Sequence, residues 1–169
     1  MPVNIEIKAR VHDFESLYKK AKKLSDTPCQ VIPQEDTFFN CPQGRLKLRE
    51  LNPQLGQLVF YQRADIQGPK HSDYRIFETH RPAELKEILS DAYGVRGVVS
   101  KVRYLFMVGQ TRIHLDKVKD LGEFIELEVV LKPGQADTDG EQIAKNLIQQ
   151  LGITKQDLID VAYMDMLEK

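Results

Sequence analysis

Arg45-Leu46-Lys47-Leu48-Arg49 shows the pattern on which the interpretation of this sequence rests, because basic and apolar residues alternate in it without a break. Side chains two residues apart in a β-strand point to the same face of the sheet. The segment therefore predicts a strand with three cations on one face and two leucines on the other. Asn52-Pro53 and Gly56 follow as turn residues and favour a hairpin into the next strand.

The same alternation recurs in strands predicted on both sides of this segment. Their charged faces hold Glu6, Lys8 and Arg10; Tyr61 and Arg63; Lys101 and Arg103; Arg112, His114 and Asp116; and Glu126 with Glu128. The opposite faces are mostly apolar, as in Ile5 and Ile7 or Ile113 and Leu115. Each predicted strand is therefore amphipathic.

Three amphipathic helices are predicted between these strands. Their apolar residues recur at helical spacing over residues 14–24, 82–93 and 138–151. About eight strands, joined largely by short turns, indicate an α+β protein with a mainly antiparallel sheet. The helices need an apolar surface to cover, and the apolar faces of the strands supply it.

The charged face of such a sheet has two alternatives. It is either exposed to solvent, as in many one-sided antiparallel sheets, or enclosed within a barrel. On closure, Lys8, Arg45, Lys47, Arg49, Arg63, Lys101, Arg103 and Arg112 would converge on one cavity. Such cations would repel one another unless a polyanion lay among them, and arginine matches phosphate oxygens in pairs. Periodicity leaves both alternatives open.

Carboxylates fall on the same charged faces, namely Glu6, Asp116, Glu126 and Glu128. Hard oxygen ligands of this kind are what Mg²⁺ or Mn²⁺ requires. Basic groups beside metal-binding carboxylates in one cavity are typical of polyphosphate chemistry. His114 lies among these residues and is interpreted either as a donor to phosphate or as a structural histidine.

The bulk composition limits the classes of function. The 169 residues suit one domain, residues 1–169, and 24 lysines and arginines almost balance 25 aspartates and glutamates. The net charge of −1 argues against electrostatic binding to nucleic acid or to an anionic membrane. Two cysteines, no N-terminal leader and no apolar run of membrane-spanning length predict a cytoplasmic protein. The oligomeric state stays open, a homodimer included.

The charged motifs resemble those of the CYTH superfamily, named for class IV adenylyl cyclases and thiamine triphosphatases. The matching segments are residues 4–8 (NIEIK), 34–39 (QEDTFF), 45–50 (RLKLRE), 101–103 (KVR), 112–116 (RIHLD), 122–128 (GEFIELE) and 163–167 (YMDML). This ordered series covers nearly the whole chain, and residues 109–116 are most similar to the class IV adenylyl cyclase branch. Asn4 stands where the motif Glu-x-Glu-x-Lys has its first glutamate, so weaker or altered metal binding is expected.

The resemblance implies a triphosphate tunnel, in which eight antiparallel strands close around a charged lumen with helices outside. It implies that the cations named above, together with His114, hold phosphates. Glu6, Glu126 and Glu128, with Asp116, would then hold Mg²⁺ or Mn²⁺. Lys8, Glu6 and Arg49 are the expected catalytic residues.

The leading hypothesis is a metal-dependent hydrolase that removes the terminal phosphate of ATP, thiamine triphosphate or inorganic triphosphate. A water activated by the metal, or by Lys8 if that lysine is deprotonated, attacks the terminal phosphorus. The second hypothesis is a class IV-type adenylyl cyclase that converts ATP to cyclic AMP and pyrophosphate. The third is a module that binds a phosphorylated metabolite without turnover, which the missing carboxylate at Asn4 keeps open.

Overall fold

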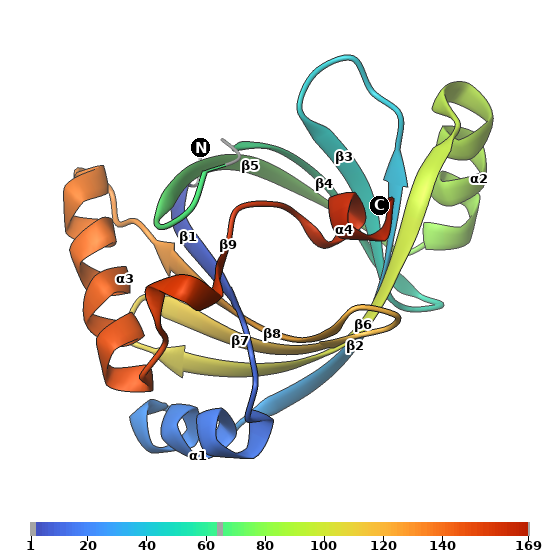
Figure 1. Cartoon of the computed structure of the whole chain (residues 1–169). Coiled ribbons are helices and arrows are strands. Elements are labelled where there is room, and N and C mark those ends of the chain that lie inside the picture. The colour runs from blue at the N-terminus through green and yellow to red at the C-terminus, as the bar shows by residue number, and fades with distance from the viewer. Residues whose placement is uncertain (1–2, 64–65, 169) are drawn as a thin grey trace.

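The computed structural model describes residues 3–63 and 66–168, and their strands form one antiparallel sheet with helices around it (Figure 1). The strands are β1 (Val3–Arg10), β2 (Gln30–Phe39), β3 (Arg45–Asn52), β4 (Leu55–Arg63), β5 (Lys70–Thr79), β6 (Val95–Val108), β7 (Thr111–Val118), β8 (Gly122–Val130) and β9 (Leu158–Ile159). The helices are α1 (Phe14–Leu24), α2 (Pro82–Tyr93), α3 (Asp137–Leu151), the short 3-10 helix η1 (Lys155–Asp157) and α4 (Tyr163–Leu167). The three predicted helices are confirmed, and α4 in the tail is an additional one.

The sheet closes on itself. Its strands pair antiparallel in the order β5-β4-β3-β2-β6-β7-β8-β1, and β5 also pairs with β1. In that closing pair Val3 lies opposite Asp73, and Glu6 lies opposite Lys70. The expected closed eight-stranded antiparallel barrel is therefore confirmed, and the alternative of an open sheet is excluded.

The C-terminal segment extends the seam and then crosses the barrel. β9 pairs with β1 beyond the end of β5, with Lys8 opposite Ile159. The Lys70 ammonium group donates a hydrogen bond of 2.7 Å to the backbone carbonyl of Asp160, which ties β5 to the same segment. From there the chain passes over the barrel opening to α4, which contacts β6 (Figure 1). The tail thus covers one end of the barrel.

The main hydrophobic core lies outside the barrel, between its wall and helices α1 and α3. Its buried residues include Ile5, Ile113 and Leu127 from the strands and Leu147 and Leu151 from α3. Because the apolar faces of the strands turn outward to these helices, the charged faces of the same strands turn into the lumen. Helix α2 contacts β2, β3 and β4.

A smaller apolar cluster packs the tail onto the barrel. Val99 and Phe124 from the wall contact Tyr163 and Met164 of α4. Gly97 on β6 allows this approach, because a side chain at that position would collide with Met164. The tail is therefore held by packing as well as by the seam.

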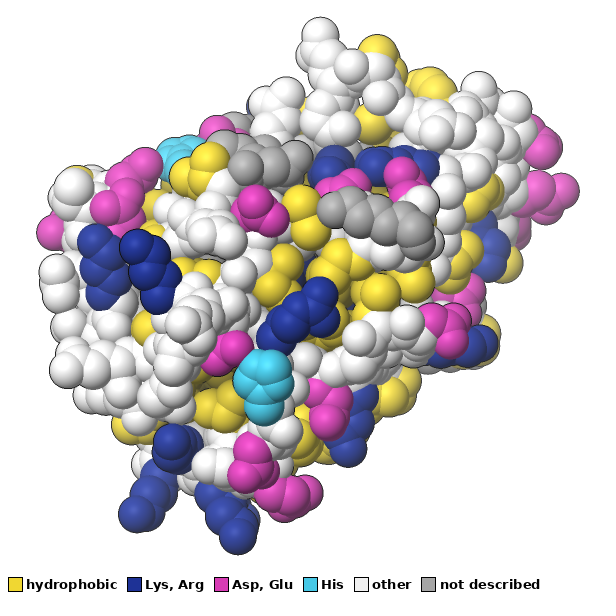
Figure 2. All heavy atoms as spheres, in the orientation of Figure 1, with side chains coloured by type: hydrophobic (Ala, Val, Ile, Leu, Met, Phe, Trp, Pro, Cys, Tyr) yellow, Lys and Arg dark blue, Asp and Glu magenta, His cyan; other side chains and the backbone are white. Residues whose placement is uncertain are grey.

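The outer surface mixes charges of both signs. On the face seen in Figure 2, basic and acidic side chains are interspersed over the surface. Within residues 3–63 and 66–168, no helix combines the length and the apolar composition that crossing a bilayer demands. The cluster of like cations predicted from the sequence is consequently a feature of the lumen and not of this face.

Candidate active site

The lumen contains a cavity of about 310 Å³, lined by residues from all eight long strands and from the tail. The predicted site residues that line it are Glu6, Lys8, Lys47, Arg49, Lys101, Arg103, Arg112, His114, Glu126 and Glu128. A larger but shallower hollow of about 830 Å³, bordered by Pro53, Pro82 and Val118, has mostly apolar walls. The charged lumen is therefore the candidate active site.

The basic side of the cavity is organised around Asp36, which is 1% exposed. Arg49 donates from Nε and Nη2 to the two carboxylate oxygens of Asp36, at 2.8 Å each. The Lys101 ammonium lies 2.8 Å from the same carboxylate, and that of Lys47 lies 3.7 Å from it. Burial alone would raise the pKa of Asp36, but these three cations hold it well below its ordinary value. Asp36 is thus an internal counter-ion that keeps the cations together before any ligand binds.

The surroundings of both lysines in this cluster lower their pKa values. Burial, followed by repulsion from Arg49, lowers the pKa of Lys47 well below its ordinary value. Burial also lowers the pKa of Lys101 to about 8, although Asp36 opposes the change. The negative charge of a bound phosphate would oppose these shifts.

Asp116, predicted as a metal ligand, is the counter-ion of Arg103 in the structure. Nε and Nη2 of Arg103 donate to the two oxygens of Asp116 at 2.8 Å each, and the Tyr163 hydroxyl donates to Oδ2 at 2.9 Å. Asp116 is fully buried behind these groups and does not line the cavity. Arg103 lowers its pKa to about 2 against the opposing effect of burial. Both oxygens of Asp116 already accept hydrogen bonds, and its role as a metal ligand stays a prediction.

The acidic side of the cavity is formed by Glu6, Glu126 and Glu128. Glu6 lies directly opposite Glu128 across strands β1 and β8. Lys8 lies opposite Glu126, with its ammonium 3.6 Å from the carboxylate. Burial, and then the charges of Glu6 and Glu126, raise the pKa of Glu128 to about 7. Like charges opposite one another in a sheet are destabilising, so this side of the lumen favours an added proton or cation.

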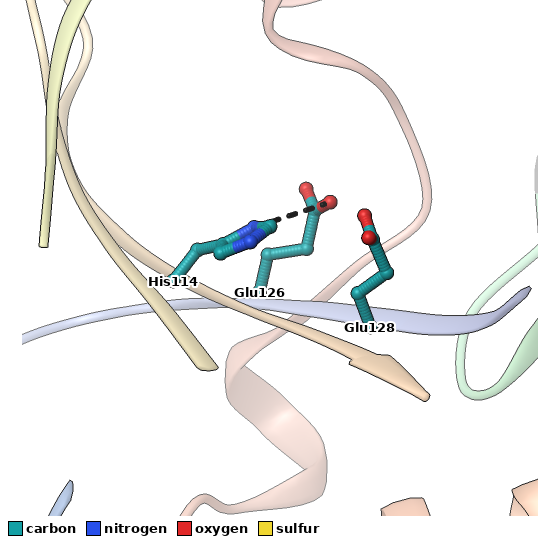
Figure 3. A group of neighbouring side chains, drawn as sticks. All are labelled: His114, Glu126 and Glu128. Atoms are coloured by element: carbon teal, nitrogen blue, oxygen red, sulfur yellow. Dashed lines mark ion pairs between the residues drawn. The ribbon is translucent and has the colours of Figure 1, made fainter. Parts of the chain in front are cut away.

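His114 belongs to the acidic side of the lumen. Its ring projects from β7 in the same direction as Glu126 and Glu128 from β8 (Figure 3). Nδ1 of His114 lies 4.0 Å from Glu126, and one ligand atom of each of the three residues lies within 4.8 Å of the others. Burial, followed by the charge of Arg103, lowers the pKa of His114 well below its ordinary value, which favours the neutral imidazole.

Three predicted phosphate ligands differ from the rest in their placement. Nη2 of Arg45 donates to Asp165 in α4 at 2.7 Å, and Arg45 does not line the cavity. Arg112 lines the cavity but is exposed, which places it at an opening of the lumen. The side chain of Arg63 lies outside the described residues.

Two functional candidates, Asp36 and Tyr163, were not among the predicted site residues. Asp36 stands opposite Arg49 in the pairing of β2 with β3. Knowledge of this strand register would have been needed to predict the pair from the sequence. Tyr163 enters the lumen from the tail, with the Lys8 ammonium 3.9 Å from the centre of its ring. Its motif was noted, but the sequence offered no means of placing a C-terminal tyrosine inside a barrel formed by earlier strands.

The family model of the CYTH domain matches residues 3–163 of the chain. The chain belongs to the CYTH family. A comparison with curated proteins found no matching sequence. Similarity to solved structures extends over almost the full length of this chain and of the chains compared with it. The sequence identities are low and establish the fold alone.

Three of these structures illustrate the range of the CYTH fold. The PH1012 protein of Pyrococcus horikoshii is 24% identical, with a TM-score of 0.84, and the match covers 96% of this chain and 98% of that one. A proposed adenylate cyclase of Vibrio parahaemolyticus is 20% identical, with a TM-score of 0.79 and 98% of each chain covered. HpAC1 of Hippeastrum, a proposed adenylyl cyclase with a dominant triphosphatase activity, is 13% identical, with a TM-score of 0.70, and 99% of this chain and 95% of that one are covered.

The acidic side of this CYTH tunnel fits a divalent cation by its donor chemistry. Glu6, Glu126 and Glu128 offer carboxylate oxygens whose mutual repulsion a cation would relieve. Asn4, at 2% exposure, also lines the cavity, and its Oδ1 has no hydrogen-bond partner among the described residues. An amide oxygen can coordinate a metal or a bound water, so the departure from the Glu-x-Glu-x-Lys motif removes a charge but keeps a donor.

Proposed function

We propose that this CYTH protein is a metal-dependent hydrolase of the terminal phosphate of an organic triphosphate. The observation that carries the proposal is the division of one cavity into a basic side around Asp36 and an acidic side around Glu128. Phosphoryl transfer requires cations that neutralise the phosphates and carboxylates that hold a metal, within one water-poor space.

Each side has a role in this reaction. Arg49, Lys47 and Lys101 hold the phosphate chain, and the incoming oxygens share these cations with Asp36. Glu6, Glu126 and Glu128 would hold Mg²⁺ or Mn²⁺, which when bound neutralises phosphate charge and lowers the pKa of a coordinated water.

Lys8 stands where the two sides meet. Its ammonium lies between Glu126, at 3.6 Å, and the ring of Tyr163, at 3.9 Å from the ring centre. This position supports contact with the terminal phosphate or with the attacking water. The proposed gain in rate comes mainly from positioning and from stabilisation of developing charge.

The lining of the cavity favours an organic over an inorganic triphosphate. Apolar side chains share the lumen with the charges, among them Ile32, Leu51, Ile76 and Leu105. Inorganic triphosphate has no apolar surface with which to cover them. A base or another organic group on the triphosphate would do so.

Adenylyl cyclase activity is the second candidate, favoured by the same apolar lining and by the likeness to proposed adenylate cyclases. In that reaction the 3′-hydroxyl of ATP attacks the α-phosphorus and pyrophosphate leaves. The cations that hold the phosphates serve both reactions, which differ in the nucleophile and in the phosphorus attacked.

The test is incubation of the purified protein with ATP, thiamine triphosphate or inorganic triphosphate and either Mg²⁺ or Mn²⁺. Orthophosphate release supports hydrolysis, and cyclic AMP with pyrophosphate supports the cyclase. We expect Glu128→Gln to remove turnover and Glu123→Gln, on the same strand but outside the lumen, to retain it. Tight binding without any product would contradict both enzymatic proposals.

A further inference from the structure

An imidazole lies among the carboxylates of the lumen and has no role in the chemistry described above. His114 is 3% exposed, projects from β7 into the cavity, and shares its space with Glu126 and Glu128 (Figure 3). One ligand atom of each residue falls within 4.8 Å of the others, which is a separation that a single ion can bridge.

A second observation concerns the hydrogen bonding of this ring. Nδ1 of His114 is buried and has no hydrogen-bond partner among the described residues. Its nearest carboxylate oxygen, on Glu126, lies at 4.0 Å, beyond hydrogen-bond distance. A histidine kept for structure alone is expected to have its buried ring nitrogens satisfied. The orphaned nitrogen therefore points to a ligand between the ring and the two glutamates.

We propose that His114, Glu126 and Glu128 form a mixed nitrogen and oxygen site that binds Mn²⁺ in preference to Mg²⁺. The inference deepens the proposed function, since it concerns the metal of the same lumen. It assigns His114 to the metal and not to the phosphates, contrary to the expectation from the resemblance.

The selectivity follows from the donor set. Mg²⁺ takes oxygen ligands in near-ideal octahedral geometry and keeps several waters. Imidazole is a softer donor than a carboxylate oxygen, and Mn²⁺, as a transition ion, accepts a nitrogen ligand more readily than Mg²⁺ does while it still takes carboxylate oxygens. A site with only carboxylates would discriminate less between the two ions. Replacing His114 by aspartate is therefore expected to shift the preference toward Mg²⁺.

The decisive experiment uses the full chain with metal alone and no substrate. Mn²⁺ bound to the wild-type protein is examined by pulsed electron paramagnetic resonance for coupling to an imidazole nitrogen. Protein labelled with ¹⁵N in its histidines identifies the source of the coupling. Calorimetry gives the dissociation constants of Mn²⁺ and Mg²⁺ for the wild type, His114→Asp and the control His12→Asn. His12 is an exposed surface histidine that pairs with Asp157.

We expect nitrogen coupling in the wild type and in His12→Asn, and its loss in His114→Asp. The ratio of the Mg²⁺ to the Mn²⁺ dissociation constant should fall about tenfold or more in His114→Asp only. Mn²⁺ bound without histidine coupling, an unchanged ratio, or no Mn²⁺ binding at all would overturn the inference. The wild-type spectrum answers the question even if the variant does not fold. Absence of triphosphate turnover with the coupling present would refute the proposed function and leave this inference standing.

Discussion

Arg49 and Asp36 face each other across strands β3 and β2 and form a two-point ion pair, with Nε and Nη2 each 2.8 Å from a carboxylate oxygen. The sequence suggested that the cations of the lumen would lack partners until a polyanion arrived. The pair shows that the protein itself supplies a carboxylate as counter-ion to these cations, as it does for Arg103 with Asp116. Asp36 stabilises the basic side in the free protein, and a bound phosphate must share or displace it.

Arg49→Ala and Arg112→Ala should therefore differ in stability although both weaken ligand binding. Removing Arg49 leaves Asp36 buried with only the two lysines, and we expect the free energy of unfolding to fall by about 2 kcal/mol. Arg112 is exposed, so its removal should change the free energy by less than about 0.5 kcal/mol. Each variant should bind triphosphate about 1–3 kcal/mol more weakly. Urea unfolding and calorimetry measure the two quantities, and equal stability of the variants would contradict the role given to Asp36.

The stability of the ligand-free protein should increase at alkaline pH because of Lys101. Its pKa is about 8 in the folded protein against an ordinary value of 10.5, so between these values the unfolded chain binds more protons. Unfolding therefore becomes less favourable as the pH rises through this window. From pH 7.5 to 10 we expect a gain of about 2 kcal/mol that Lys101→Met does not show. Denaturation curves for both proteins across this range give the comparison, and parallel pH profiles would show that Lys101 is not the cause.

Glutamate at position 4 should make stability depend on metal. Asn4 is buried two residues from Glu6, so Asn4→Glu adds a carboxylate to a lumen that already repels charge. We expect the metal-free variant to lose about 1–3 kcal/mol of stability. Mn²⁺ or Mg²⁺ should then raise its melting temperature by more than that of the wild type.

The control for this change is Asn146→Glu, at an exposed position on α3. It introduces the same charge away from the lumen and should behave as the wild type with and without metal. Thermal melts of the three proteins with chelator, Mg²⁺ or Mn²⁺ are sufficient. An equal response to metal in all three would show that residue 4 does not face the ion.

Asp165 should hold the tail over the lumen. Its carboxylate accepts from Arg45 at 2.7 Å and from Arg96 at 2.8 Å, and thereby joins α4 to β3 and β6. Asp165→Ala should speed hydrogen exchange of the amides in residues 163–167 by about tenfold. Asp157→Ala, which removes a surface pair with His12 in the same segment, should leave these amides unchanged. Mass spectrometry measures exchange in this segment. Unchanged protection of the amides of residues 163–167 in Asp165→Ala would show that Asp165 does not hold the tail over the lumen.

Several features of the site were predictable because they depend on local geometry. Alternation in residues 45–49 places Lys47 and Arg49 on one face, and alternation in residues 126–128 does the same for Glu126 and Glu128. The structure brings these side chains to one cavity. Arg45 follows the same alternation, yet it is the first residue of β3 and pairs with Asp165 of the tail. The face of the strand to which a side chain points follows from local spacing in the sequence. The position of a residue along the barrel axis does not.

The amino-acid sequence was sufficient to establish the amphipathic strands, the three larger helices and which side chains share the charged face, because each follows from spacing along the chain. Closure of the barrel, the pairing of Asp36 with Arg49 and of Asp116 with Arg103, and the entry of Tyr163 into the lumen depended on contacts between segments distant in the chain. Strand register and the path of the tail fix those contacts, and a repeat of two residues carries no information about which strand lies beside which. The division of the lumen into a basic and an acidic side is accordingly a property of the folded protein.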